Sequence, residues 1–143
     1  IIEAEQELSE KLKISAGDKV LKIRKVFTAN KEPIIYVINH IPVWVFENDL
    51  SFAEALRPDA TKKFKHFFEV ICNQKFLYFV SEVRADVYKN VNAPDVMSNY
   101  DPNTPVFIID QVGYNKNDRP VLESCEFHPG EWMKFRMIRR CKY

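Results

Sequence analysis

The sequence predicts an α+β domain built on a largely antiparallel sheet with flanking helices. Two pairs of strand-like runs carry this prediction, one in residues 19–42 and one in residues 105–140. Within each pair a short polar turn separates the two runs, as it does in β-hairpins. The segments outside the pairs hold apolar residues at helical spacing, which adds helices to the predicted sheet.

Length and composition bound the class of protein. The 143 residues suffice for one domain with a hydrophobic core, and 46% apolar with 29% charged residues is an ordinary globular balance. The 21 basic and 20 acidic residues nearly cancel, so this segment has no electrostatic basis for non-specific nucleic-acid binding. No apolar run reaches the roughly 18 residues that span a bilayer, and we expect no membrane partner.

The three cysteines are odd in number, and neither they nor the three histidines show the close spacing of metal ligands. We also find no leader-like segment, and we therefore expect a cytoplasmic protein with reduced thiols and with no metal or cofactor. A nucleophile elbow, an HExxH zinc motif and a phosphate loop are missing as well. We therefore expect no catalytic residues.

The first half of the chain alternates between helical and strand patterns. Apolar residues recur every three or four positions in the helical segments. In the first strand apolar and polar side chains alternate, whereas the second is apolar almost throughout, as a strand covered on both faces is. The patterns predict helices at residues 3–14, 50–56 and 61–72, the last capped by Thr61, and strands at residues 20–29 and 34–41.

The second half has more strand patterns than helical ones. Asn92 can cap a short helix with Pro94 in its first turn, a position that suits proline. A Pro-Gly break at residues 129–130 ends the second strand of the later hairpin. The predicted strands are residues 75–88, 105–114, 121–128 and 134–141.

Lys25 stands out because it falls on the apolar face of its strand, between Ile23 and Phe27. A lysine among buried positions must pair with an anion or extend its stem to water, because an unpaired buried charge is costly. The anion can belong to a ligand or to the protein itself, with Glu126 as an internal partner. Both interpretations stay open from the sequence.

Several short motifs lie in an order and spacing that resemble one known family. They are Leu12-Lys13-Ile14 before Gly17, the hairpin Ala29-Asn30-Lys31-Glu32-Pro33-Ile34, Ile41-Pro42, Val83-Arg84 through Val87, Tyr114 with Asp118-Arg119-Pro120-Val121, and His128-Pro129-Gly130-Glu131 through Phe135. Together they make the chain similar to the UTRA domain, the effector-binding domain of GntR-type transcription regulators of the HutC branch. The resemblance implies the chorismate-lyase-like fold of that domain.

The resemblance implies a domain at residues 1–143 that binds a small-molecule effector and forms a homodimer, within a bacterial repressor of transcription. In this family a winged helix-turn-helix module precedes the domain and binds operator DNA. That module is not in this sequence. We expect operator DNA to be contacted only by that module, in the full-length protein. We also expect the first strand of the effector-binding domain to be clipped. The alternatives are a small lyase-like enzyme on the same fold and an interaction domain without a ligand.

The resemblance also places the binding site. Sugar-phosphate sensors of the family clasp the phosphate with two arginines, where this chain has Lys25 and Phe27. Because these residue types differ, we expect a pocket in the usual place with other chemistry. Its ligand would be a small anionic metabolite, such as a phosphorylated sugar, an organic acid or an amino acid. The remaining candidate residues are Val37, Lys63, Lys65, Leu122, Ser124, Glu126 and His128.

Some of these positions have plainer interpretations. Lys63 and Lys65 begin the predicted Phe-rich helix, and free N–H groups at a helix N-terminus can hold an anion. A run of lysines is also typical of a solvated face. His128, on the strand face of Ser124 and Glu126, can hydrogen-bond a ligand or simply satisfy a loop carbonyl.

Overall fold

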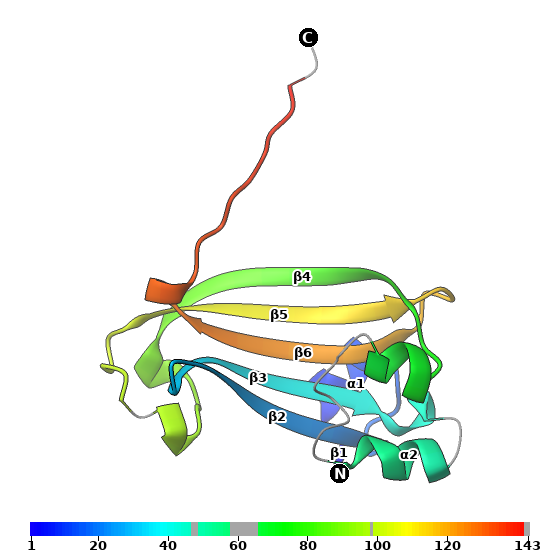
Figure 1. The fold of residues 1–143 in the computed structure, drawn as a ribbon. Coiled ribbons are helices and arrows are strands. Elements are labelled where there is room, and N and C mark those ends of the chain that lie inside the picture. Colours follow the sequence, from blue (N-terminus) through cyan, green and yellow to red (C-terminus); the bar gives the residue numbers. More distant parts are fainter. Residues whose placement is uncertain (47–48, 58–65, 98, 142–143) are drawn as a thin grey trace.

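An antiparallel sheet forms the framework of the molecule (Figure 1). The computed structural model describes residues 1–46, 49–57, 66–97 and 99–141, and in these residues the sheet has six strands in the order β1-β2-β3-β6-β5-β4. The strands are β1 (Ile2–Glu3), β2 (Lys19–Ala29), β3 (Glu32–Pro42), β4 (Phe76–Val87), β5 (Pro105–Asn115) and β6 (Pro120–Pro129). The predicted α+β class with a largely antiparallel sheet is confirmed.

Short helices flank the sheet, as predicted. They are α1 (Gln6–Leu12), α2 (Asp49–Ala55), the π-helical η2 (Phe67–Ile71), and the 3-10 turns η1 (Val43–Val45), η3 (Tyr88–Asn90), η4 (Asp95–Met97) and η5 (Gly130–Trp132). In the described part of the chain, every helix is too short or too polar to cross a membrane.

The two predicted hairpins are both present, and each follows from its turn. Asn30 and Lys31 between β2 and β3 have φ of 50° and 69°, the left-handed values that tight hairpin turns require. Between β5 and β6, the side-chain oxygen of Asn115 accepts hydrogen bonds from the N–H groups of Asn117 and Arg119. An asparagine that bonds the backbone in this way stabilises the turn.

The hairpins join through β3 and β6, which pair from Tyr36 opposite Phe127 to His40 opposite Glu123. This pairing is non-local, because the paired residues are 83 to 91 positions apart in sequence. The sheet is therefore continuous from β2 to β4, and any site on its face can draw residues from both hairpins.

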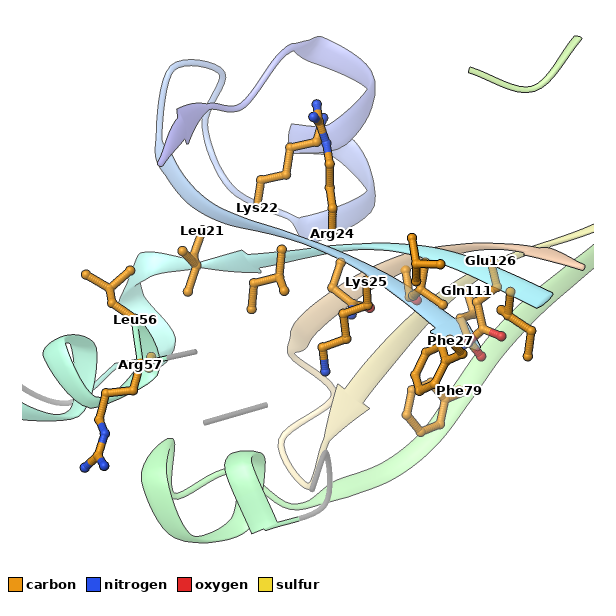
Figure 2. Close-up of a pocket in the computed structure, with 17 residues that line it drawn as sticks. Leu21, Lys22, Arg24, Lys25, Phe27, Leu56, Arg57, Phe79, Gln111 and Glu126 are labelled. Carbon is orange, nitrogen blue, oxygen red and sulfur yellow. The ribbon is translucent and has the colours of Figure 1, made fainter. Parts of the chain in front are cut away.

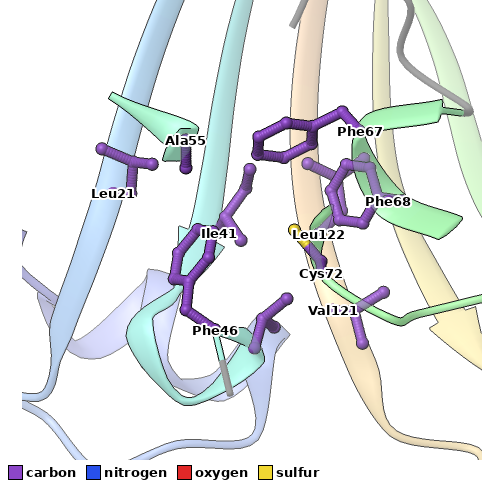
Figure 3. Packing of buried hydrophobic residues seen from close by; sticks show 10 residues of the cluster. Leu21, Ile41, Phe46, Ala55, Phe67, Phe68, Cys72, Val121 and Leu122 are labelled. Carbon is purple, nitrogen blue, oxygen red and sulfur yellow. The ribbon is translucent and has the colours of Figure 1, made fainter. Parts of the chain in front are cut away.

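The main hydrophobic core lies between one face of the sheet and the layer of α2 and η2 (Figure 3). Phe67 and Phe68 of η2 are fully buried there. A fully buried phenylalanine contributes about 1.5–3 kcal/mol to folding. The core consists of Leu21, Ile41, Val45, Phe46, Ala55, Phe67, Phe68, Cys72, Val121 and Leu122.

The opposite face of the sheet is covered at one end by α1. Its Leu12 packs with Ala4 and with Val20 of β2 in a second, smaller core. The predicted helix at residues 3–14 is shorter than expected, because Ile2 and Glu3 pair with β2 as β1. Because β1 pairs with the start of β2, the helix α1 that follows β1 lies next to β2, the strand that carries Lys25.

The predicted strand at residues 134–141 is wrong: within residues 133–141 the backbone pairs with no other strand. The segment instead extends away from the sheet (Figure 1). A strand needs a partner for its N–H and C=O groups, so an alternating pattern by itself does not make one. The predicted helix at residues 61–72 appears as η2, and Thr61 lies outside the described residues.

Candidate functional site

A cavity of about 960 Å³ opens on the face of the sheet that also carries α2 and η2 (Figure 2). Strands β2 to β6 and the end of α2 form its wall. Small-molecule sites have volumes of about 300–1,000 Å³, so the cavity is large enough for a metabolite. The polar residues of the lining are Lys22, Arg24, Lys25, Asn39, Arg57, Gln111, Ser124 and Glu126, and of these Lys22 and Arg24 direct their side chains to the other side of β2 (Figure 2).

The strand register explains why residues far apart in sequence meet on this wall. Lys25 lies opposite Val37, and Val37 lies opposite Glu126. Side chains that lie opposite each other on neighbouring strands point to the same face of the sheet. The adjacent row, displaced by two residues along each strand, consists of Ile23, Asn39, Ser124 and Gln111.

Lys25 brings a positive charge into the cavity. Figure 2 shows its side chain directed from β2 into the space between the sheet and the helical layer, whereas Lys22 and Arg24 point to the other side of β2. Burial lowers the pKa of the Lys25 ammonium, because partial removal of water disfavours the charged form. A bound anion would offset that cost by pairing with the charge.

Glu126 is held in place by two neighbours. Its Oε1 accepts a hydrogen bond of 2.8 Å from Gln111 Nε2 on β5. Its Oε2 lies 2.9 Å from Nε2 of His128, which is two residues along β6. Because an ionised carboxylate only accepts hydrogen bonds, that nitrogen carries the proton. The carboxylate is therefore oriented in advance, with lone pairs left for a donor in the cavity.

Aromatic rings form the apolar part of the wall. Phe27 and Phe79 lie close together at one end of the cavity (Figure 2), and Phe79 packs on Phe76 with ring centroids 4.7 Å apart. Phe76 in turn packs on the core residue Phe68 at 4.7 Å. The rings connect the cavity wall to the core, which keeps that side of the site rigid.

The structure brings together five of the predicted site residues. These are Lys25, Phe27, Val37, Ser124 and Glu126, which all line the cavity. His128 is not part of the lining but contacts it through Glu126. Leu122 belongs to the core, where it is 1% exposed, and does not line the cavity. Lys63 and Lys65 lie outside the described residues.

The cavity lining also contains residues that were not predicted from the sequence, among them Asn39, Gln111, Phe79, and Arg57 after α2. A signal for the amides was present, because each is a polar residue within an otherwise apolar strand pattern. Nothing local distinguishes Phe79 or Arg57 from other surface residues. Their place in the site follows from how β4 and α2 pack.

Two thiols near the site are unsuited to nucleophilic chemistry. Burial raises the pKa of Cys72 to about 12, and it also raises the pKa of Cys125, which hydrogen-bonds Asp110. The thiolate is the reactive form of cysteine, so both are inert near neutral pH. Across the described ranges, no group of three His, Cys, Asp or Glu side chains is placed to hold a metal ion.

Comparison with known proteins places this geometry in a family. The family model of the UTRA domain matches residues 1–134. A GntR-family transcriptional regulator from Bacillus cereus is similar with a TM-score of 0.78 and 21% identity, over 97% of this chain and 92% of that one. No curated protein matches the chain in sequence.

Two further solved structures show the same fold. A GntR-family transcriptional regulator from Enterococcus faecalis has a TM-score of 0.76 and 17% identity, over 96% of this chain and 94% of that one. The effector domain of PhnF from Mycobacterium smegmatis has a TM-score of 0.71 and 18% identity, over 98% of this chain and 82% of that one. At these identities the likeness is one of fold.

Proposed function

This chain belongs to the UTRA domain family, and from that premise we propose that its cavity binds a small anionic metabolite as the effector of a bacterial transcription regulator. The domain is homologous to the effector-binding domains of GntR-family regulators. A binding role, without a catalytic step, is supported by the regulatory character of its structural neighbours.

The observation that carries the proposal is the position of Lys25. Its ammonium enters a cavity of about 960 Å³ from an otherwise apolar strand face, and burial lowers its pKa. An anionic group of the effector would pair with this ammonium by a charge-assisted hydrogen bond. Ser124, Gln111 and the oriented carboxylate of Glu126 would then bind hydroxyl or ammonium groups of the same molecule.

Strands β3 and β6 line the cavity with one face and contact α1 with the other, and this arrangement suggests how effector binding would be transmitted. Next to Asn39 and Ser124, which face the cavity, His40 and Glu123 face α1, and Glu123 contacts Lys11 of that helix at 3.7 Å. An effector that binds one arrangement of β3 and β6 more tightly would shift the position of α1. In a homodimeric repressor with DNA-binding modules ahead of α1, that shift would change the affinity for operator DNA.

The test is a thermal-shift and calorimetric screen of sugar phosphates, organic acids and amino acids against the purified chain. An effector at 100 times its Kd should add roughly 2.7 kcal/mol to the free energy of unfolding. For a compound that binds, Lys25→Met should weaken affinity by about 1.5–3 kcal/mol, the contribution of a hydrogen bond to a charged group.

Lys22→Met is the matched control, because it removes the same charge from the same strand where the side chain points away from the cavity. It should leave affinity unchanged. Equal losses in the two variants would show that net charge alone attracts the ligand. An unchanged affinity in Lys25→Met would refute the proposed position of the anion.

A further inference from the structure

The cavity wall carries an acid as well as a base. In the described part of the lining, Glu126 is the one acidic residue, and its side chain is 26% exposed. Lys25 extends into the same cavity from β2 (Figure 2). A partly buried carboxylate is costly unless hydrogen-bond donors or a positive charge compensate it. The charge of Glu126 is therefore a second electrostatic requirement that the wall places on a ligand.

The neighbours of Glu126 use only part of its hydrogen-bonding capacity. Gln111 donates one hydrogen bond to Oε1 at 2.8 Å, and Nε2 of His128 lies 2.9 Å from Oε2. An ionised carboxylate has about four lone-pair positions, so each oxygen can still accept from another donor. The two neighbours fix the orientation of the carboxylate, and Glu126 lines the cavity, so a donor on a ligand can reach it.

A ligand with negative charge alone would meet an opposing charge in this cavity. Lys25 and Glu126 lie in one row across the sheet, with Lys25 opposite Val37 and Val37 opposite Glu126. Neighbouring strands are about 4.8 Å apart, so roughly 10 Å separates the backbones of Lys25 and Glu126. An anion at Lys25 is therefore repelled by Glu126, because charges in a partly buried site are only weakly screened. A positive group on the same ligand converts that repulsion into attraction.

The row also sets the spacing of charges in such a ligand. A charge-assisted hydrogen bond is about 2.8 Å long, so two of them fill more than half of the roughly 10 Å between the strands that carry Lys25 and Glu126. Roughly 4–5 Å then remains between the acid and the amine of the ligand. An α-amino acid carries both groups on one carbon and is too short. Two or more carbons between the groups span the distance.

We propose that the effector is a zwitterion, with its acid group at Lys25, a protonated amine at Glu126, and at least two carbons between them. This inference rests on the proposed function, because it names the class of anionic metabolite that the cavity selects. An ammonium group has three N–H donors, which suit the open positions of the carboxylate and the hydroxyl of Ser124 on the same face of β6. Glu126 is thereby a specificity-determining residue, which favours the amino-substituted anion over the same anion without the amine.

The test is a set of ligand titrations, followed by NMR, of the purified chain with pairs of compounds that differ by one amine. The pairs are 4-aminobutyrate with butanoate, and 3-aminopropyl phosphate with propyl phosphate, so that the acid can be a carboxylate or a phosphate. In the preferred pair the amine should tighten binding by roughly 10- to 100-fold, the gain from a hydrogen bond between charged groups. Glycine should gain little over acetate, because its amine is one carbon from the acid.

Glu126→Gln removes the charge from the cavity wall but keeps the shape of the side chain and one acceptor oxygen. The advantage of the amine should disappear, whereas butanoate or propyl phosphate should bind as well as before or more tightly. Glu82→Gln is the matched control, because it removes the same charge from β4 at an exposed position opposite Asp110, outside the cavity lining. It should leave the advantage of the amine intact. Equal losses in the two variants would refute a specific contact with Glu126.

Glu126→Asp gives a second test that keeps the charge, and circular dichroism checks the fold of each variant. The aspartate withdraws the carboxylate by one methylene, so the preference should move from 4-aminobutyrate towards 5-aminopentanoate. If Glu126→Gln does not fold, this change of preference decides the question. An unchanged preference for 4-aminobutyrate would then refute the contact.

Failure of this inference can be separated from failure of the proposed function. If butanoate or propyl phosphate binds, Lys25→Met weakens that binding, and the amine adds nothing, the zwitterion is refuted and the anion site stands. A gain for glycine over acetate as large as that for 4-aminobutyrate over butanoate would refute the spacing. If no member of either pair binds at millimolar concentration, this inference and the proposed function both fall.

Discussion

Nδ1 of His40 lies 2.6 Å from Oε2 of Glu123, across the seam where β3 of the first hairpin meets β6 of the second. The carboxylate is buried, with 5% of Glu123 exposed, and Lys11 of α1 approaches it at 3.7 Å. One buried carboxylate thus links both hairpins and the helix at the start of the domain. The same seam carries Asn39 and Ser124 on its other face, in the cavity.

Glu123→Gln should lower the free energy of unfolding by about 1 kcal/mol. Hydrogen bonds to charged groups contribute about 1.5–3 kcal/mol, and neutral ones about 0.5–1.5 kcal/mol. Urea unfolding measures the change. Lys11→Met is the control and should cost less, because its partly exposed ion pair is screened by water. A larger loss of unfolding free energy in Lys11→Met than in Glu123→Gln would show that Glu123 contributes mainly through Lys11 of α1 and not through His40.

Lys25 should make stability depend on pH in the alkaline range. Burial lowers its pKa below the unfolded value, so the unfolded chain binds the proton more firmly. Stability should therefore rise as pH increases from the folded-state pKa towards that of the free side chain. Because its pKa is lowered in the folded chain, the charged form is disfavoured on balance at pH 7, and Lys25→Met should be at least as stable as the natural chain.

Urea unfolding of both chains at pH 7 and pH 10 checks this sign. The difference in the free energy of unfolding between the two chains should be smaller at pH 10, because the lowered pKa leaves more of the natural side chain neutral there than at pH 7. A Lys25→Met chain that is less stable at pH 7 would instead indicate an internal ion pair that holds the lysine.

Gly113→Ala should destabilise the domain and disturb the cavity wall. A Cβ on Gly113 would lie 2.5 Å from Cε1 of Phe76 and 2.7 Å from Cε1 of Phe79. Overpacking of this kind costs about 1–3 kcal/mol. Phe79→Leu removes one of the two rings, so the cost of Gly113→Ala should be smaller in that background. Equal costs in both backgrounds would mean that Phe79 moves aside freely.

Iodoacetamide should label Cys141 well before the other two cysteines. Cys141 is exposed, whereas Cys72 is buried with a pKa of about 12, and the pKa of Cys125 is raised by burial and its bond to Asp110. Intact-mass measurement at pH 8 should show one added group in the native chain and three in urea. Early labelling of Cys125 would show that β6 opens and exposes the strand that carries Glu126.

The sequence alone determined the elements that local chemistry controls. Turn residues at 29–33 and 115–118 predicted both hairpins, because the left-handed values at Asn30 and the Asn115 side-chain bonds are local properties. The two-residue period of a strand was enough to place Lys25 on the face with Ile23 and Phe27. The motif order was enough to identify the UTRA domain, which the family model confirms over residues 1–134.

Which of those faces forms a cavity and which forms a core depends on the packing of the whole domain. Leu122 and Ser124 share a face of β6, yet Leu122 is buried under the helical layer and Ser124 lines the cavity. Asn39 and Gln111 join the site only through the pairing of β3, β6 and β5. Residues 133–141 repeat a strand pattern but form no strand. In each case the outcome depends on a partner distant in sequence, and local propensity carries no information about that partner.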